Sequence, residues 1–228
     1  MTRHVVVVSA GLSDPSTTRL LADRLADAVG TAVAGRGEQT LVEVIEVREL
    51  ATDLATAMTT GGLVTPALAR ARDAVASADA VIAVTPVFNA SYSGLFKLFV
   101  DALERDALDG TPVLIAATAG TARHSLVLEH AMRPLFSHLR AVVVPTAVFA
   151  ATEDFGDGDA AGLGERITRA ASQLAALLVA GGTAVGGLGR GHADRRPAGV
   201  ATVTPFTQLL RGRTGRTGAG GSTTTPHR

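Results

Sequence analysis

Hydroxyl side chains gather in the segment "SAGLSDPSTTRLL", which joins an apolar run to a helix-like pattern near the start of the chain. The first N–H groups of a helix have no intrahelical partner, and the helix dipole is positive there. Hydroxyls at such a position predict a phosphate site that needs neither metal nor lysine. The alternative is that Ser16 or Thr17 serves only as the N-cap. The hydroxyls belong to Ser9, Ser13, Ser16, Thr17 and Thr18.

A second segment, "TPVFNASYSGLFK", has the composition of a wall for a flat ring. Pro86 sets the chain direction, Val87 and Phe88 offer apolar surface, and the backbone of residues 87–90 offers N–H and C=O groups. A planar heterocycle such as isoalloxazine requires apolar walls and a few fixed polar contacts. Ser93 is expected to begin the helix that follows.

The third segment, "ATAGTARHS", contains Thr118, Ala119 and Gly120 at the end of another apolar run. A small turn with glycine lets the backbone approach a ligand closely. His124 and His130 follow it, and we interpret both as packed or surface residues because such histidines are seldom catalysts. No segment matches G-x-G-x-x-G or G-x-x-x-x-G-K-[ST], so the dinucleotide fingerprint and the P-loop are both excluded.

Composition excludes several further classes of site. The chain of 228 residues has no cysteine, which excludes disulfides, thiolate catalysis and iron–sulfur clusters, and no His-x-x-x-His pair predicts a metal. Its apolar runs are too short for a membrane span and no signal peptide is visible, so we expect a cytoplasmic protein without membrane contact. From Thr183 onward the chain carries +6 and the remainder −6, and an acidic body argues against nucleic-acid binding.

The elements that must position these segments alternate between strand and helix. Continuous Val/Ile/Leu runs are typical of strands covered on both faces, and the alternating 40–47 segment is expected at a sheet edge. Such alternation predicts an α/β three-layer sandwich of flavodoxin-like type, with a five-stranded parallel sheet in the order 2-1-3-4-5. A ligand then binds where strands 1 and 3 end. Strands are expected at 4–10, 40–47, 80–86, 111–118 and 141–150, and helices at 16–29, 66–76, 94–103, 125–139 and 159–180.

The composition changes after Gly182. Residues 1–182 are expected to form the folded domain, whereas residues 183–228 are rich in Gly, Thr and Arg and predict a flexible tail. An apolar island at 203–210, "VTPFTQLL", is a candidate docking segment. The alternative is a short turn that rests on its own domain.

With these segments in place, the chain resembles the NAD(P)H-dependent FMN reductase family of flavodoxin-like proteins, and especially the reductase component of two-component alkanesulfonate-type and luciferase-like monooxygenase systems. The similarity extends over roughly residues 3–155 and rests on three stretches. They are "SAGLSDPSTTRLLADRL", "ADAVIAVTPVFNASYSGLFKLFVDAL" and "ATAGTARHSLVLEHAMRPLFSHL". Some relatives carry an inserted aromatic that produces a π-helix after the fourth strand, and His130 occupies about that place here.

The resemblance implies hydride transfer from NADPH or NADH to the N5 atom of FMN, without a catalytic side chain and without metal. It implies that reduced FMN is supplied to a flavin-dependent monooxygenase, and that the protein is a homodimer or homotetramer. Arg19 would be a contact of the phosphate or of the pyridine nucleotide, or a surface residue. The implied FMN contacts are Ser9, Leu12, Ser16, Thr17 and Thr18 for the phosphate, and Pro86, Val87, Phe88, Asn89, Thr118, Ala119 and Gly120 for the ring.

Two other functions remain open at this point. The same loops would hold FMN in an enzyme that keeps the flavin bound and reduces a quinone or azo compound with NAD(P)H. A non-catalytic protein that acts through its tail is the other alternative. A receiver-type signalling domain shares the strand order but requires acidic residues after strands 1 and 3, where this chain has "SAG" and "TPVF".

Overall fold

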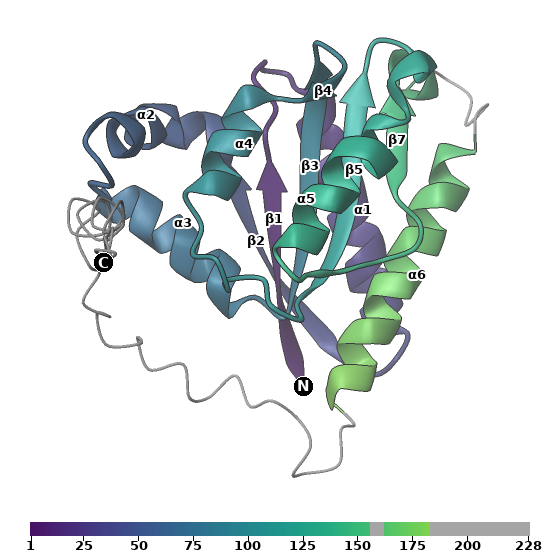
Figure 1. Cartoon of the computed structure of the whole chain (residues 1–228). Coiled ribbons are helices and arrows are strands. Elements are labelled where there is room, and N and C mark those ends of the chain that lie inside the picture. Colours follow the sequence, from purple (N-terminus) through teal and green to yellow (C-terminus); the bar gives the residue numbers. More distant parts are fainter. Residues whose placement is uncertain (156–161, 183–228) are drawn as a thin grey trace, which may run out of the picture. The chain divides into compact units, whose positions relative to one another are not determined.

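A parallel sheet forms the centre of the computed structural model, which describes residues 1–155 and 162–182 (Figure 1). The strand order is β2-β1-β3-β5-β6, and β7 also pairs with β5. The two-residue strand β4 pairs antiparallel with the end of β3. This is the predicted flavodoxin-like arrangement. The strands are β1 (Thr2–Ser9), β2 (Gln39–Glu46), β3 (Ala80–Phe88), β4 (Ser91–Tyr92), β5 (Pro112–Ala119), β6 (Val142–Val143) and β7 (Val148–Ala151).

Two short strands occupy the position where a single strand was predicted at 141–150. Val142–Val143 pairs with the start of β5 and Val148–Ala151 with its end, so residues 144–147 lie opposite only residues 114–115. Pro145 stands in this stretch and has no N–H to donate to a ladder. The prediction of a continuous fifth strand was therefore wrong, although its place in the sheet was right.

Helices cover both faces of the sheet (Figure 1). In β1, Val5 and Val7 face a core shared with α1 and α6, whereas Val6 and Val8 face a core shared with α2, α3, α4 and α5. Successive side chains of a strand point to opposite faces, and helices cover both faces, so both sets are buried. The helices are α1 (Thr17–Ala34), α2 (Ala51–Thr59), α3 (Pro66–Ser77), α4 (Gly94–Asp101), α5 (Arg133–His138) and α6 (Leu163–Gly182), with 3-10 turns η1 (Val47–Leu50), η2 (Ala122–His124) and η4 (Thr152–Phe155).

The helix predicted at 125–139 is interrupted by a π-helix, η3 (Leu128–Met132), which contains His130. The N–H of Arg133 donates to the carbonyl of Leu128, five residues back. Pro134 follows and cannot donate to the carbonyl of His130, so the ordinary α-helical bond is missing at this point. An aromatic insertion is therefore not required for a π-helix here.

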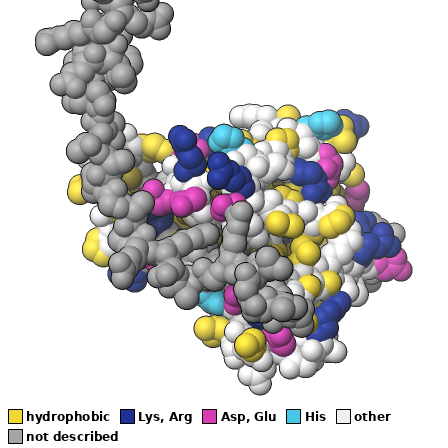
Figure 2. Space-filling view, turned by 60° about the horizontal axis from the view of Figure 1, so that its bottom comes forward, with side chains coloured by type: hydrophobic (Ala, Val, Ile, Leu, Met, Phe, Trp, Pro, Cys, Tyr) yellow, Lys and Arg dark blue, Asp and Glu magenta, His cyan; other side chains and the backbone are white. Residues whose placement is uncertain are grey.

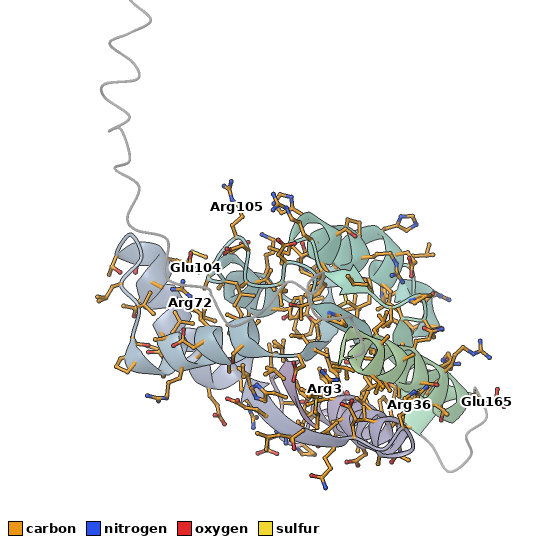
Figure 3. All side chains as sticks on the ribbon, turned by 90° about the horizontal axis from the view of Figure 1, so that it is seen from below. Arg3, Arg36, Arg72, Glu104, Arg105 and Glu165 are labelled. Carbon is orange, nitrogen blue, oxygen red and sulfur yellow. The ribbon has the colours of Figure 1, made fainter. Side chains whose placement is uncertain are left out.

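An ion pair and hydrogen bonds join elements around the amino-terminal ends of the strands, which Figure 3 views from below. Arg72 of α3 pairs with Glu104, which follows α4. Arg36, which follows α1, donates to the carbonyl (3.2 Å) and hydroxyl (3.0 Å) of Ser172 in α6. Figure 2 shows basic and acidic side chains interspersed on this side of the molecule.

Within the described residues, none of the helices has the length and apolar character needed to cross a membrane. The same residues contain no cluster of three or more His, Asp or Glu that could hold a metal ion. The predicted tail (183–228), its candidate docking segment (203–210) and the first residues of the helix predicted at 159–180 lie outside the described residues.

Candidate functional site

A cavity of about 330 Å³ lies at the carboxyl edge of the sheet, where β1, β3, β5 and β7 end. Three of its walls are the segments that the sequence predicted, and they converge because parallel strands all end at the same edge (Figure 1). The fourth wall follows β7. The lining residues are Leu12, Ser13, Ser16, Thr17, Thr18, Pro86, Val87, Phe88, Thr118, Ala119, Gly120, Thr152 and Phe155.

Ser16 is the N-cap of α1, as the simpler interpretation of the first segment proposed. Its Oγ accepts a hydrogen bond from the N–H of Arg19 at 3.2 Å. A serine hydroxyl that accepts one bond still has its own proton to donate. Ser16 therefore caps the helix and can also donate to an anion placed at the start of α1.

Gly11 makes this geometry possible and was not among the predicted site residues. A Cβ atom at Gly11 would lie 2.1 Å from Ser16 Oγ and 3.2 Å from the Cβ of Thr18. Only glycine leaves room for the Ser16 side chain to fold back over the loop. The reason is a contact five residues along the chain, which the residue type alone does not indicate.

The hydroxyls of Thr18 and Thr118 hold two walls together. Their Oγ1 atoms are 2.8 Å apart, and both residues are only 3% exposed. Each hydroxyl can donate once, so one of the two protons is committed to this bond. Ser9, the last residue of β1, is fully buried and does not line the cavity, and within the described residues its Oγ has no hydrogen-bond partner.

The second segment forms a hairpin before α4 begins. Val87 pairs with Tyr92 and Phe88 with Ser91, and the turn residues Asn89 and Ala90 have φ of 48° and 66°. Positive φ at both central residues is the conformation of a type I′ turn. Val87 and Phe88 line the cavity, whereas Asn89 is not among the lining residues. The backbone around the predicted ring wall is thus largely fixed by the hairpin itself.

Ser93 begins α4 as predicted. Its Oγ accepts from the N–H of Phe96 at 3.1 Å, and its own N–H donates to Thr85 Oγ1 at 3.0 Å. These bonds tie the hairpin to the helix from both sides. Lys97 and Asp101, one turn apart in α4, form a surface ion pair at 2.7 Å.

Thr152 and Phe155 belong to η4, directly after β7, and sequence reasoning missed both. Asp154 holds this turn in place: its Oδ2 accepts from the N–H of Ala151 at 2.7 Å, and its Oδ1 from Arg166 of α6 at 3.1 Å. The Asp154 side chain is only 6% exposed. The position of both residues directly after the fifth predicted strand was the available signal.

The lining has no charged side chain among the described residues. Arg19, a candidate phosphate contact, donates instead to Glu46 (2.6 Å) and Asp23 (2.7 Å), and those hydrogen bonds raise its pKa. Arg48 donates to the carbonyl of Ser13 at 3.2 Å and supports the loop from outside. The cavity thus offers hydroxyls, backbone N–H groups and apolar surface.

A larger hollow of about 830 Å³ lies along the solvent-facing side of α6, beside Arg36 and Glu165. It shares no residue with the cavity at the strand ends. It is an open groove on the outside of one helix, whereas the smaller cavity combines a helix start with the ends of four strands. Position in the fold therefore favours the smaller cavity as the functional site.

A family model described as NADPH-dependent FMN reductase matches residues 3–156, which include every wall of the cavity. The chain belongs to this family. It is an oxidoreductase that acts on FMN with NADPH or NADH.

The sequence similarity to relatives of this FMN reductase extends over most of its length. An FMN reductase (NADPH) from Pseudomonas aeruginosa is 39% identical over 154 residues, which are 66% of this chain and 78% of the relative. The NADH-dependent FMN reductase SfnE from Pseudomonas putida is 37% identical over 179 residues, 77% of this chain and 92% of the relative. Since the names of these two relatives specify different dinucleotides, they leave the choice between NADPH and NADH open.

Solved structures agree with this assignment. An oxidoreductase from Corynebacterium diphtheriae has 55% sequence identity and a TM-score of 0.76, covering 78% of this chain and 98% of its own. The apo form of an NADH:FMN oxidoreductase, EMOB, has 32% sequence identity and a TM-score of 0.62, and the match covers 74% of this chain and 88% of that structure's chain.

The cavity fits FMN on its own chemistry. The start of α1 supplies N–H groups and hydroxyls for a phosphate, and the ends of β3 and β5 supply apolar surface and backbone for a ring. The buried, unpartnered Ser9 Oγ at the base of the first loop is a further polar group that a bound anion and its ordered water could satisfy.

Proposed function

We propose that this FMN reductase takes FMN as a dissociable substrate and supplies the reduced flavin to a flavin-dependent monooxygenase. The observation that carries the proposal is the uncharged lining of the cavity. Neutral hydroxyl and N–H donors bind a phosphate without the ion pair and the bidentate contact that an arginine would add. A phosphate held in this way binds with moderate affinity, which suits a flavin that must leave after each turnover.

In the proposed complex the phosphate lies at the start of α1. Its donors are the N–H groups of Thr17 and Thr18 and the hydroxyls of Ser16 and Thr17. The N–H groups are available because the first turn of a helix offers them no intrahelical acceptor. Leu12 packs at the entrance. The Thr18 hydroxyl acts indirectly, since it bridges to Thr118 and fixes the distance between two walls.

The ring lies between the hairpin and the end of β5 in this proposal. Pro86, Val87 and Phe88 form one side, and the backbone of Thr118, Ala119 and Gly120 forms the other. Gly120 has no other atom within 4 Å of a Cβ built on it, so this wall leaves space for a ligand. Asn89 contributes by keeping the hairpin turn at positive φ.

FMN, when bound, supplies the chemistry, because its N5 atom accepts a hydride from the nicotinamide. The chain's residues hold the two rings in contact and exclude water from one face. None of the described lining residues titrates near neutral pH, so we propose that no side chain acts as general acid or base. Backbone N–H groups near Thr118 and Gly120 would stabilise negative charge as the ring is reduced.

The decisive experiment measures oxidation of NADPH and of NADH by purified protein, with and without added FMN. We expect protein that is colourless after gel filtration and turnover that requires and saturates with free FMN. Under anaerobic conditions one subunit should reduce many equivalents of FMN, because each product leaves. A yellow protein that keeps its flavin through gel filtration and reduces a quinone or azo dye without added FMN would overturn the proposal.

A charge placed at the helix start tests the phosphate position. Thr17→Glu should raise the KM for FMN about tenfold and leave the KM for riboflavin, which has no phosphate, nearly unchanged. A carboxylate in the first turn interacts favourably with the positive end of the helix dipole and so stabilises the helix. Misfolding is therefore not the expected cause of the weaker FMN binding. Thr31→Glu, on the exposed surface near the other end of α1, is the matched control and should change neither KM.

A further inference from the structure

Phe155 lines the cavity, as Ser16 and Thr17 at the start of α1 do. A further contact places its ring beside α1. The guanidinium carbon of Arg24, in α1, lies 5.8 Å from the centre of the Phe155 ring. Arg24 follows Thr17 by two helical turns and so lies on the same side of α1. The Phe155 ring therefore lies along the stripe of α1 that leads to the proposed phosphate position.

The backbone that carries Phe155 is held firmly. Asp154 is buried, accepts the N–H of Ala151 and is bound by Arg166 from α6, as described above. A buried carboxylate with two donors fixes the turn far more strongly than a surface contact would. The Phe155 ring is thus a fixed wall, held by a turn on one side and by Arg24 on the other.

A second wall of the cavity is the loop that precedes α1, from which Leu12, Ser13 and Ser16 line it. The loop from Leu12 to Ser16 is supported there by Arg48, which donates to the Ser13 carbonyl. This loop follows β1 and Phe155 follows β7, with β3 and β5 between these two strands in the sheet. The loop and Phe155 therefore border the cavity from opposite directions.

We propose that Phe155 determines the choice of flavin by closing the phosphate end of the site, so that FMN is accepted and FAD is disfavoured. The phosphate of FMN ends the molecule, whereas the corresponding phosphate of FAD continues into a second phosphate and an adenosine. That extension needs an exit beside the start of α1, where the Phe155 ring stands. The inference rests on the proposed position of the phosphate.

The test compares three flavins in wild type, Phe155→Ala and Phe155→Leu. Dissociation constants for FMN, FAD and riboflavin come from quenching of flavin fluorescence, and kcat/KM values come from NAD(P)H oxidation. Wild type should bind FMN at least about tenfold more tightly than FAD. Phe155→Ala should reduce this ratio about tenfold, mainly through tighter FAD binding, and should leave the ratio of FMN to riboflavin unchanged. Phe155→Leu keeps a large apolar side chain and should retain most of the selectivity.

Controls separate this inference from the function itself. Leu177→Ala, on the exposed face of α6, removes a partly exposed apolar side chain elsewhere and should leave all three constants unchanged. If Phe155→Ala does not fold, Phe155→Val gives the same comparison with a smaller shift of about threefold. An unchanged ratio of FAD to FMN in the variant, or a wild type that binds both equally, would refute the role of Phe155. If the wild type does not turn over FMN, the proposed function is refuted instead. The ratio of the dissociation constants for FAD and FMN would still test the role of Phe155.

Discussion

Substitution of Gly11 by alanine tests whether the first loop is held by close contact. The new methyl group would lie 2.1 Å from Ser16 Oγ, so the serine must rotate away from its hydrogen bond with the Arg19 N–H. Loss of an N-cap costs about 1 kcal/mol of unfolding free energy. Loss of the hydrogen bond from the Ser16 hydroxyl to the phosphate anion costs about 1.5 to 3 kcal/mol of binding, or roughly ten- to 150-fold in the Kd for FMN.

Urea unfolding and flavin fluorescence titration measure these two effects separately. Gly35→Ala, at the other end of α1, is the matched control, since its methyl would lie 3.5 Å from the Thr31 carbonyl in ordinary contact. In a Ser16→Ala background the Gly11 substitution should cost less, because the closest atom has been removed. Equal costs in both backgrounds, or a Gly11→Ala protein with unchanged stability and Kd, would show that the contact does not hold the loop.

Three further changes test other parts of the site and fold. Thr18→Val or Thr118→Val alone should lower the unfolding free energy by about 1 to 3 kcal/mol, because a buried hydroxyl loses its partner. The double variant should lose less unfolding free energy than the sum of the two single losses, which a double-mutant cycle in urea measures. Ala90→Gly should raise the unfolding free energy by about 0.5 to 1 kcal/mol, because φ of 66° disfavours alanine, and an unchanged or lower urea midpoint would contradict this. The hydrogen bond from Arg133 lowers the pKa of Glu129, so its stabilisation is present above the unfolded pKa and is lost as pH falls through the folded pKa. Glu129→Gln should therefore narrow the difference in Tm between about pH 6 and about pH 3, and a difference as large as in wild type would contradict the assignment.

Much of the fold followed from local patterns. Val5 to Val8 read as a strand buried on both faces, and each face does meet a separate core. Pro145 was a visible signal in the sequence for the break between β6 and β7. A strand was nevertheless predicted across it, because the flanking residues are strongly β-forming. The π-helix at 128–132 depends on a helix-interior proline that does not end the helix, since tertiary packing holds both sides of it.

The site was predicted as far as its chemistry is local. The hydroxyls before α1 and the residues after β3 and β5 could be read directly, because each segment carries its own donors or apolar surface. Asn89 stays a predicted ring contact: it does not line the cavity, and its φ of 48° belongs to a hairpin turn that the residue types alone do not specify. Arg19 resembled a phosphate ligand only until Glu46, from another strand, was seen beside it.

The amino-acid sequence by itself determined most of the elements, their alternation and the uncharged, hydroxyl-rich character of the first loop, because these depend on neighbours along the chain. Only the tertiary structure decided that Thr18 meets Thr118, that Ser16 requires Gly11, and that Phe155 lines the cavity. Thr18 and Thr118, and Phe155 and the start of α1, come together only after the strands have paired in register, and Ser16 meets Gly11 only when the loop folds back on itself. A side chain's partner across the sheet is set by packing and strand order, which no local pattern records.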